Sequence, residues 1–128
     1  MSYTFNKTLR MPFDDAIVHV TKALADKGFG VLTTIDVKAT MKKKLDVDFR
    51  PYTILGACNP TFAHQALLHE DKFGSMLPCN VVVQQKGDGE VEVSAVDPIA
   101  SMMAIDNPKL GAVAKEVAER LRTMVAGL

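Results

Sequence analysis

Apolar residues recur along this chain with two periods, and each period predicts a different kind of secondary structure. Alternation of apolar and polar residues, or a short apolar run between turn residues, is typical of a strand. Five segments have that pattern: 3–9, 29–35, 52–58, 79–85 and 90–95. Repetition every three to four residues instead predicts an amphipathic helix. That second pattern occupies segments 13–27, 37–45, 60–68 and 108–124.

Asparagine, proline and glycine mark the ends of these segments. Asn59-Pro60 and Asn107-Pro108 are typical helix starts, because asparagine caps free N–H groups and proline fits the first helical turn. Gly28 is expected to end the first helix, and Lys86-Gly87-Asp88-Gly89 has the turn residues of a tight hairpin. Asp97-Pro98 ends the last strand and opens a short helical piece.

The predicted order is β-α-β-α-β-α-β-β-α with one short extra helical turn, in a single domain that spans residues 1–128. The hairpin in the second half argues against a purely parallel sheet. We therefore expect an α+β two-layer sandwich, with one mixed, mostly antiparallel sheet and helices packed on one face. The opposite face, if apolar, would need a cover, which a second copy of the chain would supply.

Composition and charge fit an ordinary globular domain and argue against several kinds of partner. The chain has 128 residues, of which 48% are hydrophobic and 23% are charged. Fifteen basic residues balance fifteen acidic ones, so no global field attracts nucleic acid or an anionic membrane. No apolar run approaches the ~20 residues of a membrane-spanning helix, and no secretory leader is evident. We expect a cytoplasmic protein with reduced thiols.

The stretch 52–83 carries the most specific pattern. It contains Ile54-Leu55-Gly56-Ala57-Cys58-Asn59-Pro60 and, one helix later, Leu77-Pro78-Cys79-Asn80-Val81, and Val96-Asp97-Pro98 closes the motif. Together these residues resemble the domain-of-unknown-function family numbered 302, and the likeness covers nearly the whole chain. The resemblance implies a compact α+β domain, somewhat like half of a TATA-binding-protein fold, and a tendency to form homodimers. It implies no established reaction.

Both cysteines lie in this stretch, and each is followed by asparagine. Cys58 directly precedes the expected helix cap, where backbone N–H groups and the helix dipole can lower the pKa of a thiol. If the strands that hold Cys58 and Cys79 pair, the two sulfurs approach each other and a reversible disulfide becomes feasible. Alternatively, both thiols are small buried members of the core, a common environment for free cysteine. The candidate ligand-binding residues are Cys58, Asn59, Cys79 and Asn80.

Other chemistry finds less support in the sequence. A metal site would draw on these donors: Cys58, Cys79, His64, His69, Met76, Met102 and Met103. His64 and His69 are five residues apart, about 140° around a helix, so they do not face one ion. No Ser-His-Asp set with interpretable context, phosphate-binding loop or dinucleotide glycine motif is present. The sequence therefore shows no catalytic constellation, and it leaves both the cofactor and enzymatic activity open.

The leading hypothesis is a homodimeric domain that binds a small molecule or a protein partner near Cys58 and Cys79. In this hypothesis Cys58 is a polarised thiol, Asn59 is the cap that fixes the backbone donors, and Cys79 is the neighbouring or resolving thiol. One alternative is a thiol-redox enzyme or a soft-metal carrier for copper or zinc that uses the same two cysteines. A second alternative is a structural homodimer module without a site.

Overall fold

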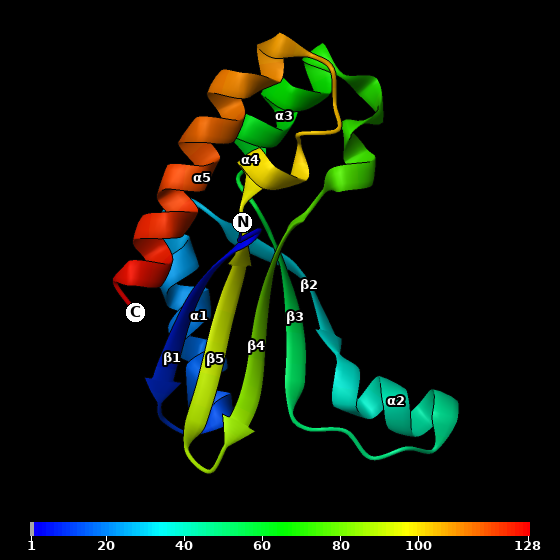
Figure 1. The fold of residues 1–128 in the computed structure, drawn as a ribbon, viewed down its shortest axis with the longest axis vertical. Helices are drawn as coiled ribbons and strands as arrows, with labels where there is room; N and C mark the ends of the chain where they lie inside the picture. The colour runs from blue at the N-terminus through cyan, green and yellow to red at the C-terminus, as the bar shows by residue number, and fades with distance from the viewer. Residues whose placement is uncertain (1) are drawn as a thin grey trace.

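The fold is built on one five-stranded sheet in the computed structural model, which describes residues 2–128 (Figure 1). The strands are β1 (Thr4–Arg10), β2 (Gly30–Asp36), β3 (Tyr52–Cys58), β4 (Cys79–Gly87) and β5 (Glu90–Val96). They lie in the order β1-β5-β4-β3-β2, and each strand is antiparallel to its neighbours. The expected α+β sandwich and its element order are confirmed, and the observed strand pairs are all antiparallel.

All helices except α2 (Val37–Leu45) lie in two places relative to the sheet. The helices are α1 (Phe13–Asp26), α2 (Val37–Leu45), α3 (Pro60–His69), α4 (Pro98–Ser101) and α5 (Gly111–Ala126), with 3-10 turns η1 (Asp71–Met76) and η2 (Pro108–Leu110). Helices α1 and α5 cover one face of the sheet, whereas α3, η1 and α4 gather beyond the end where β3 finishes and β4 begins (Figure 1). Within residues 2–128, no helix covers the face turned toward the viewer, which we call the open face.

The core lies between the sheet and the pair α1 and α5. Alternate residues of the central strands point into it, as period two requires. Seven of them are at most 1% exposed: Leu55, Ala57, Val81, Val83, Val91, Val93 and Ala95. The edge strand β1 presents Lys7 toward this layer, and its ammonium donates hydrogen bonds of 2.9 Å to the carbonyl oxygens of Ala126 and Leu128. The lysine thus satisfies carbonyls at the end of α5 that lack helical partners.

The open face is apolar on one side and polar on the other. The strand register places Ile35 beside Ile54 and Ile54 beside Val82, which together form an apolar row across β2, β3 and β4. The same row continues through Ser94 to Asn6 on β5 and β1. An antiparallel sheet often leaves one face in water. Here the polar residues of the open face lie on β5 and β1. On β2, at the opposite edge, the apolar side chain of Ile35 is 44% exposed.

Residues 30–48 hold the edge strand β2, which pairs along its length with β3, and the helix α2, which projects beyond the sheet at the end where β3 begins (Figure 1). Every residue of the edge strand β2 except Val31 is exposed, and α2 has no buried residue. The helix begins properly, because the Asp36 carboxylate accepts a hydrogen bond from the Ala39 N–H at 2.9 Å. The helix predicted from the spacing of apolar residues is therefore present, but the core does not bury its apolar stripe.

Candidate functional site

The start of α3 forms as the Asn59-Pro60 pair predicts. Asn59 Oδ1 accepts a hydrogen bond from the Phe62 N–H at 3.2 Å, and Pro60 occupies the first turn. The amide nitrogen of Asn59 faces Gly28, whose φ is +86°, and a Cβ at Gly28 would lie 3.0 Å from it. Asn59 therefore caps the helix and packs against the turn between α1 and β2.

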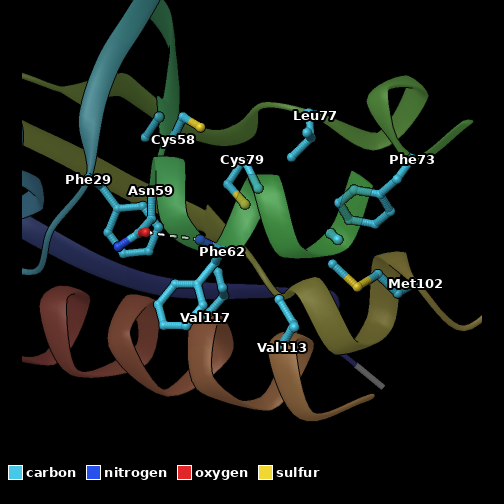
Figure 2. A pocket seen from close by; sticks show the side chains of 13 residues that line it. Phe29, Cys58, Asn59, Phe62, Phe73, Leu77, Cys79, Met102, Val113 and Val117 are labelled. Carbon is cyan, nitrogen blue, oxygen red and sulfur yellow. Dashed lines mark hydrogen bonds between the residues drawn. The ribbon is translucent and has the colours of Figure 1, made fainter. Parts of the chain in front are cut away.

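Antiparallel pairing of β3 and β4 brings both cysteines to the same end of the sheet. Ala57 pairs with Cys79, so Cys58 stands one residue beyond that pair. Both thiols are free, and both line one small cavity (Figure 2). The Cys58 sulfur is close enough that its negative charge raises the pKa of Cys79. The structure thus brings together two thiols that lie 21 positions apart in the sequence.

This thiol cavity is apolar and very small. Figure 2 shows Phe62, Val113 and Val117 across it from the two cysteines. Its volume is about 20 Å³, which holds about one water-sized group. The remaining lining residues are Phe29, Ala57, Asn59, Ala63, Ala66, Phe73, Leu77 and Met102. A cavity of this size is far below the roughly 300–1,000 Å³ of ordinary ligand pockets.

Burial raises the pKa of both thiols, so the lowered pKa expected for Cys58 is wrong. Desolvation raises the pKa of Cys58 and, together with the Cys58 charge as a lesser cause, raises that of Cys79 to about 11. The helix start does not offset this effect, because the Phe62 N–H is directed at Asn59 rather than at sulfur. Both groups are neutral thiols at neutral pH, and neither is an activated nucleophile.

A larger cleft adjoins the thiol cavity, between η1, the first residues of β4 and α4. Its volume is about 240 Å³. It shares Phe73, Leu77, Cys79 and Met102 with the thiol cavity. The other lining residues are Ser75, Met76, Pro78, Asn80, Val96, Pro98 and Ser101. We call this space the β4–α4 cleft.

The four predicted ligand-binding residues divide between these two spaces. Cys58 and Asn59 line only the thiol cavity, Asn80 lines only the β4–α4 cleft, and Cys79 lines both. Asn80 is exposed at the start of β4, in a position to meet a molecule in the cleft. The structure therefore places Cys79 at the junction, and Cys58 and Asn59 behind it.

Phe73 is a lining residue that the sequence analysis missed. It is only 2% exposed, and it lines both spaces from η1. The segment around it is polar and lacks a helical period, so the available signal was one large apolar side chain in a polar stretch. Met102, a nominal soft metal donor in the sequence, packs with Phe73 and Leu77 in a second apolar cluster.

Residues 2–128 hold neither a metal-binding cluster nor a membrane-spanning helix. Within that range, no group of three or more His, Cys, Asp or Glu side chains is arranged to hold a metal ion. None of the helices in the same range is long and apolar enough to cross a membrane.

Comparison with known proteins identifies the family. Residues 5–128 match the family model described as "Domain of unknown function DUF302". The chain belongs to this family. A similar solved structure is the "Crystal structure of uncharacterized conserved protein DUF302 from Bacillus stearothermophilus", which has 26% sequence identity and a TM-score of 0.89 and covers 98% of both chains. The resemblance inferred from the motifs at residues 54–60 and 77–81 is confirmed.

A relative found by sequence is an "Uncharacterized protein" of Aquifex aeolicus (strain VF5). It is 28% identical over 87 residues, which make up 68% of this chain and 54% of that protein. This chain therefore spans about half the length of the relative it matches. Both the Bacillus and the Aquifex proteins are described as uncharacterized, so these likenesses carry the family and the fold without a function.

Proposed function

We propose that this chain is a binding domain that takes a small, largely apolar, uncharged molecule in the β4–α4 cleft and acts as a homodimer. The observation that supports ligand binding is the cleft itself, which is about 240 Å³ in volume and lined mostly by apolar side chains. Ligand sites are typically concave and apolar, with a few polar groups that orient the ligand. The volume lies just below the usual range of roughly 300–1,000 Å³, which favours a small ligand.

The polar groups of the cleft support an uncharged ligand. None of its eleven lining residues, all in the described part of the chain, is acidic or basic. The Ser101 hydroxyl donates to the Pro98 carbonyl at 3.1 Å, and the Ser75 hydroxyl donates to the Lys72 carbonyl at 2.9 Å. Both hydroxyl oxygens therefore keep lone pairs for a donor on the ligand, while the Asn80 amide supplies donors and an acceptor.

The Cys79 thiol is part of this wall and stays neutral. Its pKa is raised to about 11, so at neutral pH it contributes a polarisable S–H rather than a charge. The raised pKa of both thiols also weakens the alternative of a redox enzyme, which needs a thiolate. We expect a reducing, cytoplasmic compartment for the two free thiols.

Binding of N-phenyl-1-naphthylamine, an uncharged probe that fluoresces in apolar surroundings, tests the ligand. We expect the wild-type chain to enhance its fluorescence. The Ser101→Phe variant should weaken binding at least about tenfold, because the added ring occupies the cleft. The matched control is Ala126→Phe, which adds the same ring at an exposed position at the end of α5. Absence of enhancement, or equal binding by both variants, would contradict the proposed site.

The second part of the proposal is that the partner is another copy of this chain. Its support is the open face of the sheet, where an apolar row crosses β2, β3 and β4 and no helix within residues 2–128 covers it (Figure 1). Light scattering at micromolar concentration measures the mass directly, and the proposal requires twice the chain mass of 13.9 kDa.

A further inference from the structure

A second hollow lies at the end of the sheet where β3 begins, and it shares no residue with the β4–α4 cleft. It is bounded by the start of α1, the junction of β2 with α2 and the start of β3, and its volume is about 350 Å³. This volume falls in the range of ordinary ligand pockets, roughly 300–1,000 Å³. We call it the α1–α2 cavity. The β4–α4 cleft lies at the opposite end, where β3 finishes (Figure 1).

Thr53 is the residue of this cavity that points to a ligand. It is the buried polar residue of the described chain, with only 7% of its surface exposed. It pairs with Asp36 on β2 and with the fully buried Val83 on β4, so its side chain lies on the face covered by α1 and α5.

The hydroxyl of Thr53 has no partner in the protein. Within residues 2–128 it forms no hydrogen bond, and no side-chain oxygen or nitrogen in that range is both sealed from solvent and unpaired. The hydroxyl must therefore reach open space, and the α1–α2 cavity is the hollow that Thr53 lines. A nearly buried hydroxyl that faces a cavity is a group whose hydrogen bonds are left for a ligand.

The first turn of α1 supplies more hydrogen-bond donors at the same place. The first backbone bond of the helix joins the Ala16 N–H to the Pro12 carbonyl at 3.0 Å, and the N–H groups of residues 13–15 precede it. No side chain caps this end of α1. Lys38 also lines the cavity, and the ion pairs of residues 2–128 do not include it. Free N–H groups, the helix dipole and an ammonium together suit a carboxylate.

Two carboxylates line the same cavity. Asp14 belongs to the first turn of α1, and Asp36 lies opposite it at the end of β2. Asp36 Oδ1 accepts a hydrogen bond from the Ala39 N–H at 2.9 Å, which leaves its second oxygen free. These acceptors suit an ammonium group, and they repel a ligand that carries only negative charge.

We propose that the α1–α2 cavity binds a small zwitterion, an α-amino acid. Its carboxylate meets the free N–H groups of α1 and Lys38, and its ammonium meets Asp14 and Asp36. Both charged groups of an α-amino acid sit on one carbon atom, so its site needs donors and acceptors side by side. The first turn of α1 has both, because the Asp14 side chain adjoins the free N–H groups. This site is separate from the uncharged ligand proposed for the β4–α4 cleft.

The remaining lining accommodates the body of the ligand. Phe13 and Pro51 contribute apolar surface beside the charged groups. An aliphatic amino acid such as L-leucine is therefore a suitable probe, and glycine is the smallest zwitterion of the same class. The Thr53 hydroxyl can donate to the carboxylate or accept from the ammonium.

Amide chemical shifts of the isotope-labelled full chain, followed during titration, measure both affinity and location. The probes are L-leucine, glycine, and two molecules that each keep one charged group of leucine: 3-methylbutylamine and 4-methylpentanoate. We expect saturable shifts at residues 13–15, 36–38 and 53 with at least one of the two amino acids. Where L-leucine binds, each single-charge probe should bind at least about tenfold more weakly, because it loses charge-assisted hydrogen bonds.

Three outcomes of the titration would overturn the proposal. The first is failure of both L-leucine and glycine to produce saturable shifts at millimolar concentrations. The second is binding of 3-methylbutylamine or 4-methylpentanoate as tight as that of L-leucine, since the site would then recognise one charge alone. The third is a set of shifts that lies away from the α1–α2 cavity.

Matched substitutions test the individual groups. Asp14→Asn should weaken binding of the amino acid about tenfold, whereas Asp15→Asn should change it less than about twofold. Both aspartates are exposed in the first turn of α1, but only Asp14 lines the cavity. Lys38→Gln and Lys44→Gln form a second such pair on α2. Equal effects within either pair would contradict direct contact with the ligand.

Thr53→Val separates binding from folding. It keeps the shape of the side chain and should weaken binding about tenfold. Its free energy of unfolding, measured by denaturant titration, should not fall, because the hydroxyl has no partner in the protein to lose. Unchanged binding by a folded Thr53→Val would contradict the role of the hydroxyl.

The two ligand sites are distinguished by exchanging their probes. Asp14→Asn should bind N-phenyl-1-naphthylamine like the wild type, and Ser101→Phe should bind the amino acid like the wild type. Failure of the amino-acid titration therefore leaves the β4–α4 cleft untouched. Loss of amino-acid binding in Ser101→Phe would place the amino acid in the cleft and overturn the second site.

Discussion

Cys79 should react slowly with thiol reagents, and its rate should report how well the site is buried. Its pKa is raised from the ordinary 9.0 to about 11. At pH 8, a thiol with a pKa of about 9 is roughly 10% thiolate, and one with a pKa of about 11 is roughly 0.1% thiolate. The greater nucleophilicity of the more basic thiolate offsets about tenfold of this difference. About tenfold slower reaction therefore remains before any steric shielding is counted.

The assay uses single-thiol variants and 5,5′-dithiobis(2-nitrobenzoate), whose released thiolate is measured by absorbance. Cys58→Ser leaves Cys79 alone, and Cys79→Ser leaves Cys58 alone. The Cys79 rate should still rise about tenfold per pH unit above pH 9.0, because its thiolate fraction has not saturated. Cys58→Ser removes the Cys58 charge, which is the lesser cause of the raised Cys79 pKa, but it leaves Cys79 buried. The pH at which the Cys79 rate levels off should therefore stay above 9.0. Unfolding in guanidinium should return both thiols to a common rate.

The same pKa difference predicts a loss of stability at alkaline pH. Cys79 holds its proton more tightly in the folded chain, so its contribution is complete below about pH 9 and decreases as the pH rises through about 11. Two pKa units correspond to a loss of at most about 2 to 3 kcal/mol in the free energy of unfolding at alkaline pH. The Cys79→Ser variant should not show this loss. A Cys79 rate that levels off near pH 9.0 in the native chain, with no alkaline loss relative to Cys79→Ser, would refute the argument from burial.

Gly56 and Asn59, two residues near the site, give further predictions. Gly56→Ala should lower the free energy of unfolding by about 1–3 kcal/mol, because its Cβ would lie 2.5 Å from Thr33 Cγ2 and 2.7 Å from Pro78 Cγ. Denaturant titration should show a much smaller loss for Gly74→Ala, whose Cβ meets nothing within 4 Å; equal losses would contradict the steric argument. Asn59→Ala removes the cap of α3 and should lower stability by about 1 kcal/mol, whereas Asn59→Asp should retain most of it. Thermal unfolding of the two variants checks this, and an unchanged Asn59→Ala would contradict the role of the cap.

Most of the fold could be predicted from the sequence, because the relevant forces act between near neighbours. The strand expected at residues 52–58 is observed with the same bounds, and Asn59 caps the next helix through a local hydrogen bond. Periodicity also predicted the helix at residues 37–45. The period of apolar residues does not reveal what a helix packs against. Here the apolar stripe of α2 is not buried by the core.

The site was predictable only as far as strand pairing determines it. Pairing of β3 with β4 places Cys58 and Cys79 together, as their positions at strand ends suggested. The pKa of Cys58 is raised and not lowered, because desolvation by the surrounding residues outweighs proximity to a helix start. Phe73 reaches the site from a turn without any period, and Met102 from a four-residue helix and its flank, so no local pattern marked either one.

The neutral lining of the β4–α4 cleft determines how a ligand would be selected. With no acidic or basic side chain in the wall, there is no long-range attraction to hasten encounter and no ion pair for salt to screen. Affinity and association rate should therefore be nearly independent of ionic strength. Discrimination between ligands would then follow from size and shape at Phe73, Cys79 and Met102 rather than from charge.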